Sequence, residues 1–445
     1  MIDDLLTLAA DAVSRARKLG ATSADALAVN RRSTSISIRD GVTEELESAE
    51  AREVGLRVFT GKAFATIAGS VLDGAGLDRL AEMAVAMAKA APEDEDAGLA
   101  DPAHYASGFP ELDLVSDTLP DADALKHMAL AAEAAAKSVS GVSKSGGAGA
   151  GQSDRAMVLV TSHGFANGYR RTGVTLSVSA IAGEGTAMER DYDYTSAVHY
   201  SDLKTAEEIG LSAGTRAAKR ANPRKVKSQS VPVVYDPRVA SSIVGHFLSA
   251  VSGDAVARGT SFLKDKMGAR ILSENITIID DPHRTRGLAS RPFDAEGLAS
   301  NETALARDGV LASWILDLRS ARKLKLVSNG RASRGLSSAP GPSSTNVYMK
   351  AGSIDPRALI AGIKDGLYVT ELIGMGANGV TGDYSRGASG FWIENGELTF
   401  AVSEITIAGN LKDMFLHLTP ANDLVFKTST SAPTLLVEGL TIAGT

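Results

Sequence analysis

The chain has 445 residues, of which 44% are hydrophobic and 22% charged, with a net charge of −7 and no cysteine. This length and balance predict a soluble protein of about two to four domains with a sizeable core. The negative charge disfavours broad nucleic-acid binding, and the absence of cysteine excludes disulfides, thiol catalysis and cysteine-ligated metal sites.

Targeting signals are not evident in the sequence. No apolar run approaches the ~20 residues of a membrane-spanning helix, and the chain opens with Asp3 and Asp4, where a signal peptide carries Lys or Arg. We therefore expect a cytoplasmic protein that has neither a membrane nor a nucleic acid as its partner.

The first part of the chain combines helical and extended patterns. An amphipathic helix begins at Ile2 and stops at Gly20, and a second helix covers about residues 77–91 and ends at Pro92. Between them, alternating apolar residues predict antiparallel strands around 34–38, 54–58 and 64–67. Residues 92–120 are acidic and lose all periodicity, so we expect a long surface excursion there.

Helix, sheet and helix then appear a second time. An Ala-rich helix covers residues 121–138, strands follow near 157–160 and 174–178, and a helix covers about residues 205–221. Because the residue before a proline disfavours helix, we place a domain boundary at Asn222-Pro223. Residues 1–222 are thus predicted to form an N-terminal α/β domain with antiparallel sheets and helices.

The second half opens with a strand at residues 231–235 and then Asp236-Pro237, a helix N-cap followed by proline at the first helical position. The helix that follows has an apolar stripe, and on its opposite face lie Ser242, His246 and Ser249. From Ile276 onward, short strands are separated by Gly, Asn and Pro. We expect residues 223–445 to form a β-rich, barrel-like C-terminal domain, which makes the fold class α+β.

A glycine-dense stretch at residues 366–398 stands out, because it combines eight glycines with the aromatic and branched residues of strands. Within it, Gly374 to Gly379 match the dinucleotide-binding pattern GxGxxG. That motif requires a helix directly after the glycines, and the residues from Val380 onward cannot start one. The stretch is therefore predicted to be a structural or peptide-binding loop.

Motifs for catalysis are absent. None of the seven histidines is followed by Glu, no two lie one helical turn apart, and no GxSxG nucleophile motif occurs. The pattern SxxK starts at Ser261 and Ser320 and is interpreted as chance. Nearby acids and bases are interpreted as solvated: Asp191, Asp193, Asp280 and Asp281, and the basic residues Lys219, Arg220, Arg224, Lys225 and Lys227.

Several stretches together nevertheless resemble one family, TldD/PmbA, on its PmbA (TldE) branch. They are EVGLRV at 53–58, RGTS at 258–261, GDYSRGASGFW at 382–392, IENG at 393–396 and EITIAGNLK at 404–412. The resemblance covers essentially the whole chain. It implies an α/β N-terminal domain, a barrel-like C-terminal domain and a cytoplasmic dimer. The TldD branch is a zinc peptidase that cuts unstructured peptides in a closed chamber, and the PmbA branch is its partner subunit.

This sequence departs from the active members of the family, which carry HExxxH and a cysteine ligand. The matching positions of the helix after Asp236 run from Ser241 and Ser242 to His246, so only the final histidine remains. A catalytic zinc normally needs three protein ligands. We therefore expect no cofactor and no metal in this chain, with zinc in a TldD-type partner.

Two functions of different classes follow. The first, which we favour, is a non-catalytic partner subunit in a heterodimer with a TldD-type chain or in a homodimer, where the chain contributes to binding an unstructured peptide, with exposed strand edges available for strand addition. Its candidate peptide- or partner-binding residues are Gly376, Asp383, Tyr384, Ser385 and Arg386. The second is an independently active peptidase or hydrolase. A DNA gyrase modulator, which older naming of the family suggests, is a third.

Overall fold

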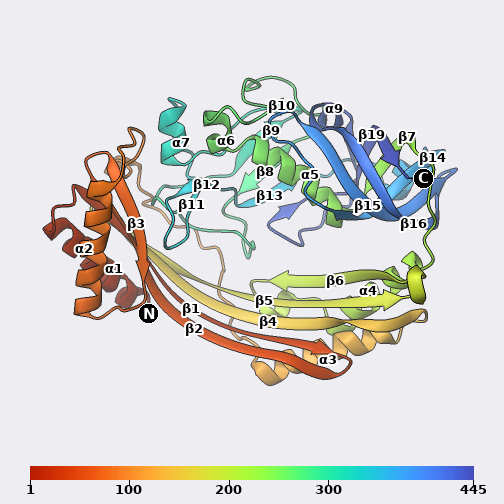
Figure 1. The fold of residues 1–445 in the computed structure, drawn as a ribbon, viewed down its shortest axis with the longest axis horizontal. Helices are drawn as coiled ribbons and strands as arrows, with labels where there is room; N and C mark the ends of the chain where they lie inside the picture. The colour runs from red at the N-terminus through yellow and green to blue at the C-terminus, as the bar shows by residue number, and fades with distance from the viewer. Residues whose placement is uncertain (445) are drawn as a thin grey trace.

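Six long antiparallel strands of the N-terminal half form one curved sheet, in the order β3-β2-β1-β4-β5-β6. The computed structural model describes residues 1–444, and Figure 1 shows the C-terminal half above this sheet. The strands are β1 (Ser23–Arg39), β2 (Val42–Thr60), β3 (Ala63–Gly69), β4 (Val142–Thr161), β5 (Ala166–Ala182) and β6 (Glu189–Ala197).

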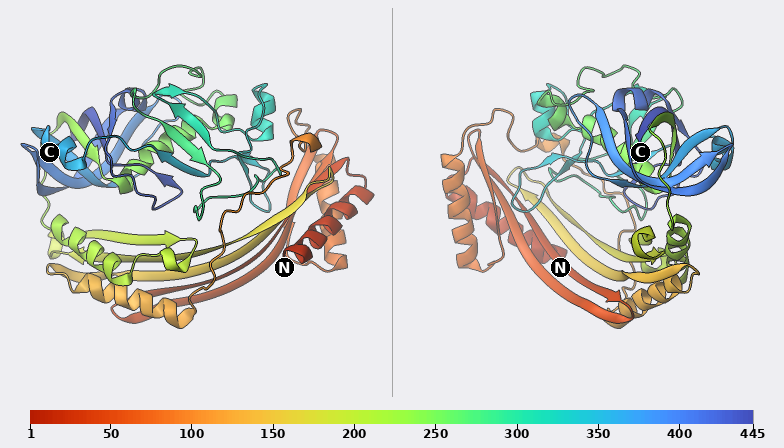
Figure 2. Two further views of the ribbon diagram at one scale, coloured as in Figure 1. Left: turned by 180° about the vertical axis from the view of Figure 1, so that it is seen from behind. Right: turned by 45° about the vertical axis from the view of Figure 1, so that its right-hand side comes forward.

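Four helices cover the two ends of this sheet and leave its middle without a helix (Figures 1 and 2). One core lies under α1 and α2 and a second under α3 and α4. The helices are α1 (Ile2–Lys18), α2 (Gly74–Ala90), α3 (Ala122–Lys137) and α4 (Ala206–Arg220). They confirm the four predicted helices to within a few residues. No helix in residues 1–444 is long and apolar enough to cross a bilayer.

The strands of this sheet are much longer than the sequence patterns predicted. Strand β4 has 20 residues, although only residues 157–160 carried a strand pattern. Its first half contains Gly146, Gly147, Gly149 and Gly151 and pairs with β5 through two register shifts. Glycine has no side chain that could mark an apolar face, so the alternation that identifies strands is missing there.

The C-terminal half contains a closed barrel of five strands, which confirms the predicted barrel-like domain (Figure 2). The barrel closes because β16 pairs with β19 as well as with β15, and β17 extends the sheet beside β19. The strands are β7 (Gln229–Tyr235), β14 (Asp365–Ile373), β15 (Asp383–Glu394), β16 (Glu397–Asn410), β17 (Leu418–Pro420) and β19 (Leu435–Ala443).

Short elements complete this half. Helix α5 (Pro237–Ala250) packs its apolar face into the same core as the barrel. The other strands are β8 (Ile278–Asp281), β9 (Thr303–Arg307), β10 (Val310–Leu311), β11 (Ala332–Ser333), β12 (Gly341–Pro342), β13 (Asn346–Met349) and β18 (Thr430–Ser431). The other helices are α6 (Gly253–Ala257), α7 (Leu318–Lys323), α8 (Pro356–Ala361) and α9 (Leu411–Leu416), with single 3₁₀ turns at Pro102–His104, Gly185–Ala187 and Tyr200–Asp202.

The acidic segment at residues 92–120 connects the two halves. Arg319 pairs with Asp94 at 2.6 Å, and Arg322 donates to three main-chain carbonyls between residues 96 and 99. Leu112 and Leu114 are buried further along. The segment is therefore anchored to both halves along its length, although its composition suggested a surface excursion.

A buried ion pair joins the N-terminal sheet to the C-terminal half. Asp25 in β1 accepts from Arg57 in β2 and, at 2.6 Å, from Arg334 of a C-terminal loop. The side chains of Asp25 and Arg334 are each 1% exposed. The same loop presses the carbonyl oxygen of Leu336 onto Gly55, where a Cβ atom would lie 2.0 Å from that oxygen. A charge triad and a glycine contact thus set how the two halves meet.

A buried carboxylate near this junction has a strongly shifted pKa. Burial raises the pKa of Glu296 to about 8, and the neighbouring carboxylate of Asp294 adds to the shift. An oxygen of Glu296 also accepts the amide of Leu318 at 2.8 Å, at the start of α7. Glu296 therefore keeps its proton at neutral pH.

We predict that Asp25→Asn lowers the free energy of unfolding by about 3–5 kcal/mol, because two buried guanidinium groups lose their counter-charge. Chemical denaturation measures this change. The matched control is Glu50→Gln, which breaks an exposed pair with Arg32 and should cost less than about 1 kcal/mol. Equal losses in the two variants would show that the junction does not depend on Asp25.

Glu296→Gln is predicted to remove part of the pH dependence of stability. Between the ordinary pKa of 4.5 and about 8, the unfolded chain releases this proton while the folded chain keeps it, so the stability of the unmutated protein falls as pH rises. The variant should therefore gain a few kcal/mol relative to it from pH 4.5 to 8. Denaturation across this range is the measurement, with the exposed Glu302→Gln as control. A constant difference across the range would contradict the shift.

Candidate functional site

Helix α5 starts at the junction of the two halves. The side chain of Asp236 accepts the amide of Arg238 at 3.0 Å, and Pro237 occupies the first helical position. The predicted N-cap and proline are confirmed. The cap fixes where the first turn of α5 begins and so places the motif positions that follow.

The three motif positions on α5 differ in what their side chains do. The hydroxyls of Ser241 and Ser242 donate to main-chain carbonyls three residues earlier, at 3.2 and 2.6 Å. The Nε2 atom of His246 is buried and has no hydrogen-bond partner in residues 1–444. The serine protons are thus taken up by the helix itself, and only His246 offers a nitrogen.

Two buried tyrosines accompany His246. Its ring meets that of Tyr384 edge to face, with 5.7 Å between the ring centres, and the hydroxyls of Tyr384 and Tyr235 are buried without partners among the described residues. Burial raises the pKa of both tyrosines and lowers that of His246, which the positive charge of Arg386 lowers further. These three groups are uncharged at neutral pH, so they can donate or accept hydrogen bonds but provide no paired nucleophile and base.

The predicted loop residues lie on the hairpin between β14 and β15, and the structure separates them. Along β15, Asp383 and Ser385 are exposed, whereas Tyr384 is 2% exposed and Arg386 is half-buried. Gly376 lies against this chain's own Ser385, where a Cβ atom would be 1.5 Å from the carbonyl oxygen. Only Tyr384 and Arg386 therefore lie near His246.

The same hairpin settles the GxGxxG match. The glycines occupy the loop after β14, and a strand, β15, follows them. The prediction that no helix starts there is confirmed, so the motif lacks the helix that would hold a pyrophosphate.

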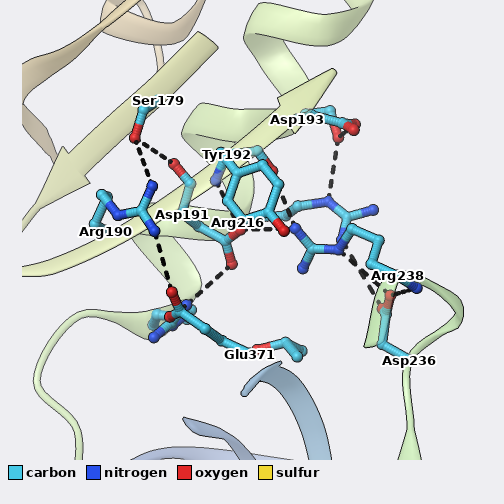
Figure 3. Close-up of polar contacts among 12 residues, drawn as sticks. Ser179, Arg190, Asp191, Tyr192, Asp193, Arg216, Asp236, Arg238 and Glu371 are labelled. Atoms are coloured by element: carbon cyan, nitrogen blue, oxygen red, sulfur yellow. Dashed lines mark hydrogen bonds and ion pairs between the residues drawn. The ribbon is translucent and has the colours of Figure 1, made fainter. Parts of the chain in front are cut away.

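Strand β6 carries charged side chains toward α5 (Figure 3). Asp191 is 2% and Asp193 4% exposed, so the expectation that both are solvated is wrong. Arg238 pairs with Asp191 at 2.8 Å, and Lys427 pairs with Asp193 at 3.0 Å. Carboxylates become this buried when each has a cationic partner, and those partners lie far along the chain.

Two further residues expected to be solvated are buried for the same reason. Arg220 is 3% exposed and pairs with Glu371 at 2.6 Å, whereas the other four members of its basic cluster are exposed. Asp280 is 0% exposed and accepts from Arg331 at 2.7 Å. Both pairs join segments that the sequence pattern gave no reason to associate.

The outer edge of β6 is partly occupied by its own chain. The amides of Tyr192 and Tyr194 donate to the carboxylates of Asp191 and Asp193, at 2.7 and 2.8 Å. The carbonyl of Tyr192 accepts from Arg238 at 3.0 Å. A peptide that paired with this edge would have to displace these contacts.

Three hollows surround these side chains. A cavity of about 460 Å³ beside the first turns of α5 is lined by Arg190, Arg238, Arg386, Glu371, Ser242 and Leu372, among others. A cleft of about 720 Å³ between α4 and the barrel is lined by Arg216, Lys219, Tyr368, Thr370, Phe391 and Leu398, among others. An open depression of about 570 Å³ on the hairpin includes Gly376, Asp383, Tyr384 and Ser385. The five predicted hairpin residues thus belong to two different hollows.

The remaining sequence candidates have structural roles. The hydroxyl of Ser261 donates to a main-chain carbonyl, and Ser320 belongs to the capping box of α7, so neither SxxK is a nucleophile site. In the part of the chain that the structure describes, no three His, Asp or Glu side chains are grouped as metal ligands.

Comparison with known proteins identifies the family. The family descriptions that match are PmbA/TldA metallopeptidase domain 1 at residues 24–88, central domain at 115–222 and C-terminal domain at 228–444. The chain is 36% identical to Metalloprotease PmbA of Escherichia coli O157:H7 over 440 residues, which cover 98% of this chain and 96% of that protein. The chain belongs to the PmbA/TldD family, on its PmbA branch.

Other members of the family agree. A Metalloprotease PmbA homolog of Haemophilus influenzae is 34% identical, covering 97% of this chain and 94% of that one. A crystal structure from Bacteroides thetaiotaomicron, described as a proposed modulator of DNA gyrase, has a TM-score of 0.91 at 29% identity, over all of both chains. TldE of Thermococcus kodakarensis shares the fold, with a TM-score of 0.88 at 20% identity over 97% of this chain and 99% of that one.

Within this PmbA-branch chain, sequence reasoning identified α5 and Arg386 but missed Arg238 and the cations that pair with β6. One local signal was available, because an arginine directly after an Asp-Pro cap lies in the first turn of a helix. Its acceptors on β6 are 46 and 47 positions away in the sequence, and no local pattern connects them.

Proposed function

We propose that this chain is a non-catalytic partner subunit of a cytoplasmic TldD-type zinc metallopeptidase that processes unstructured peptides. The observation that carries the proposal is the state of α5. Where active members have histidine and glutamate, this chain has Ser241 and Ser242, whose hydroxyls are bonded to the helix backbone. Such a helix keeps the shape of the motif without the group that activates water.

The residues present do not fit a catalytic zinc site. His246 is the one zinc-type ligand of the motif, and it faces Tyr384 rather than a second ligand. Because a catalytic zinc normally has three protein ligands, we place the metal in the TldD-type partner. A homodimer of this chain would lack the activity for the same reason.

The surface proposed to meet the peptide or the partner comprises the cavity beside α5 and the hairpin depression. Both hollows border Tyr384 or its neighbour Arg386 in β15, and the edge of β6 runs beside the cavity. Since that edge is partly occupied by its own carboxylates and by Arg238, we favour side-chain contacts over strand addition at β6.

The first test is metal content. The purified chain is predicted to hold far less than one zinc per molecule by elemental analysis after gel filtration, because it offers no cysteine and no paired histidines. A TldD-type subunit purified in the same way is the positive control. About one tightly held zinc per chain would overturn the proposal and favour an independently active peptidase.

The second test is joint activity with a TldD-type partner. Arg386→Ala should lower peptide turnover by the reconstituted pair about tenfold or more, because hydrogen bonds to charged groups contribute about 1.5–3 kcal/mol. Ser385→Ala should also lower turnover if the hairpin depression takes part. Both variants should leave the thermal midpoint nearly unchanged, since neither side chain is fully buried.

Arg270→Ala is the matched control, because it removes an exposed arginine whose partner is the nearby Glu274. Turnover at the unmutated rate in both test variants, or early melting of both, would show that the hairpin is only scaffold. A loss confined to one of them would identify which hollow takes part.

A further inference from the structure

The cavity beside α5 holds more positive than negative charge. Arg190 pairs with Glu371 at 3.1 Å, and Arg238 pairs with Asp191 at 2.8 Å. Glu371 also pairs with Arg220, outside the cavity. Each carboxylate at this place is thus already engaged by an arginine of the chain.

Arg386 is the cation left over. No carboxylate in residues 1–444 lies within ion-pair distance of its guanidinium group, and its Nε atom is buried without an acceptor. Arg238, whose side chain is 4% exposed, likewise keeps Nη2 buried without an acceptor. Two guanidinium groups with unused donors therefore border one cavity, which is costly unless an acceptor enters.

The lining indicates what kind of anion fits. A guanidinium fork matches the two oxygens of a carboxylate, and the same cavity presents Tyr192, Val239 and Leu372. This mixture suits a carboxylate carried on a carbon chain better than a fully hydrated inorganic ion. The volume of about 460 Å³ lies within the range of small-ligand sites and accommodates one terminal residue rather than a folded segment.

We propose that Arg386 and Arg238 bind the C-terminal carboxylate of a peptide, whose last side chain lies against Val239 and Leu372. The peptide as ligand rests on the proposed function, whereas the carboxylate rests on the unpaired arginine. Ser242 borders the same cavity, and because its proton is donated to the helix, its oxygen can only accept a hydrogen bond from the ligand.

The test measures binding to the isolated chain by fluorescence anisotropy, without a partner subunit. The probes are one N-terminally labelled decapeptide of Gly, Ser and Leu as the free acid, the same peptide with an amidated C-terminus, and an amidated version with one internal Glu. The free acid should bind at least tenfold more tightly than either amide. Arg386→Ala should abolish this preference, Arg386→Lys should restore it in part, and Arg270→Ala should leave it unchanged.

Two readouts separate ligand binding from a structural role. Because Arg386 has no carboxylate partner to lose, Arg386→Ala should not lower the thermal midpoint, and the free-acid peptide should raise the midpoint of the unmutated chain only. Equal binding of acid and amide, a preference that survives Arg386→Ala, or equal binding of the Glu-containing amide would each overturn the proposal.

The result is also distinguishable from that of the proposed function. If the reconstituted pair cleaves peptides while the isolated chain does not discriminate acid from amide, the carboxylate site fails alone. If the chain discriminates but the pair is inactive, the partner-subunit function fails alone.

Discussion

Arginine–carboxylate pairs shielded from water hold the two halves of this chain together. Asp25 joins β1 to a C-terminal loop through Arg334, and Asp191 joins β6 to the start of α5 through Arg238. A buried pair adds little net stability over apolar packing, but breaking one leaves a charge without compensation. Such pairs therefore select one arrangement of the two halves more than they stabilise the fold in general.

That arrangement places the cavity at the junction rather than within either half. Its wall combines β6 from the N-terminal sheet, α5 at the start of the C-terminal half, and β14 and β15 from the barrel. Ligand sites form preferentially at such junctions, because neither part has to fill the space between them. Arg386 is the member of this wall whose charge the fold leaves without a partner.

Helix α5 combines a conserved shape of capped helix with altered chemistry. The Asp236 cap and Pro237 fix its start, and the apolar face packs into the barrel core. Neither feature involves the motif positions, so serines at 241 and 242 are accommodated without a change in packing. A partner subunit can thus retain the family's architecture while its helix lacks the groups for catalysis.

The sequence alone determined the features that depend on neighbours in the chain. The four N-terminal helices, the cap of α5, the barrel-like C-terminal half and the absence of a helix after Gly379 all follow from local periodicity, caps and breakers, because helices and turns are closed by hydrogen bonds between residues a few positions apart. Only the tertiary structure decided which charges are buried. Asp191, Asp193 and Arg220 look solvated in sequence because their partners are 47, 234 and 151 positions away, at Arg238, Lys427 and Glu371. Burial of a charge depends on such partners, and strand alternation along β15 separated Arg386 and Tyr384 from Asp383 and Ser385 in the same way, which adjacency in the sequence cannot show.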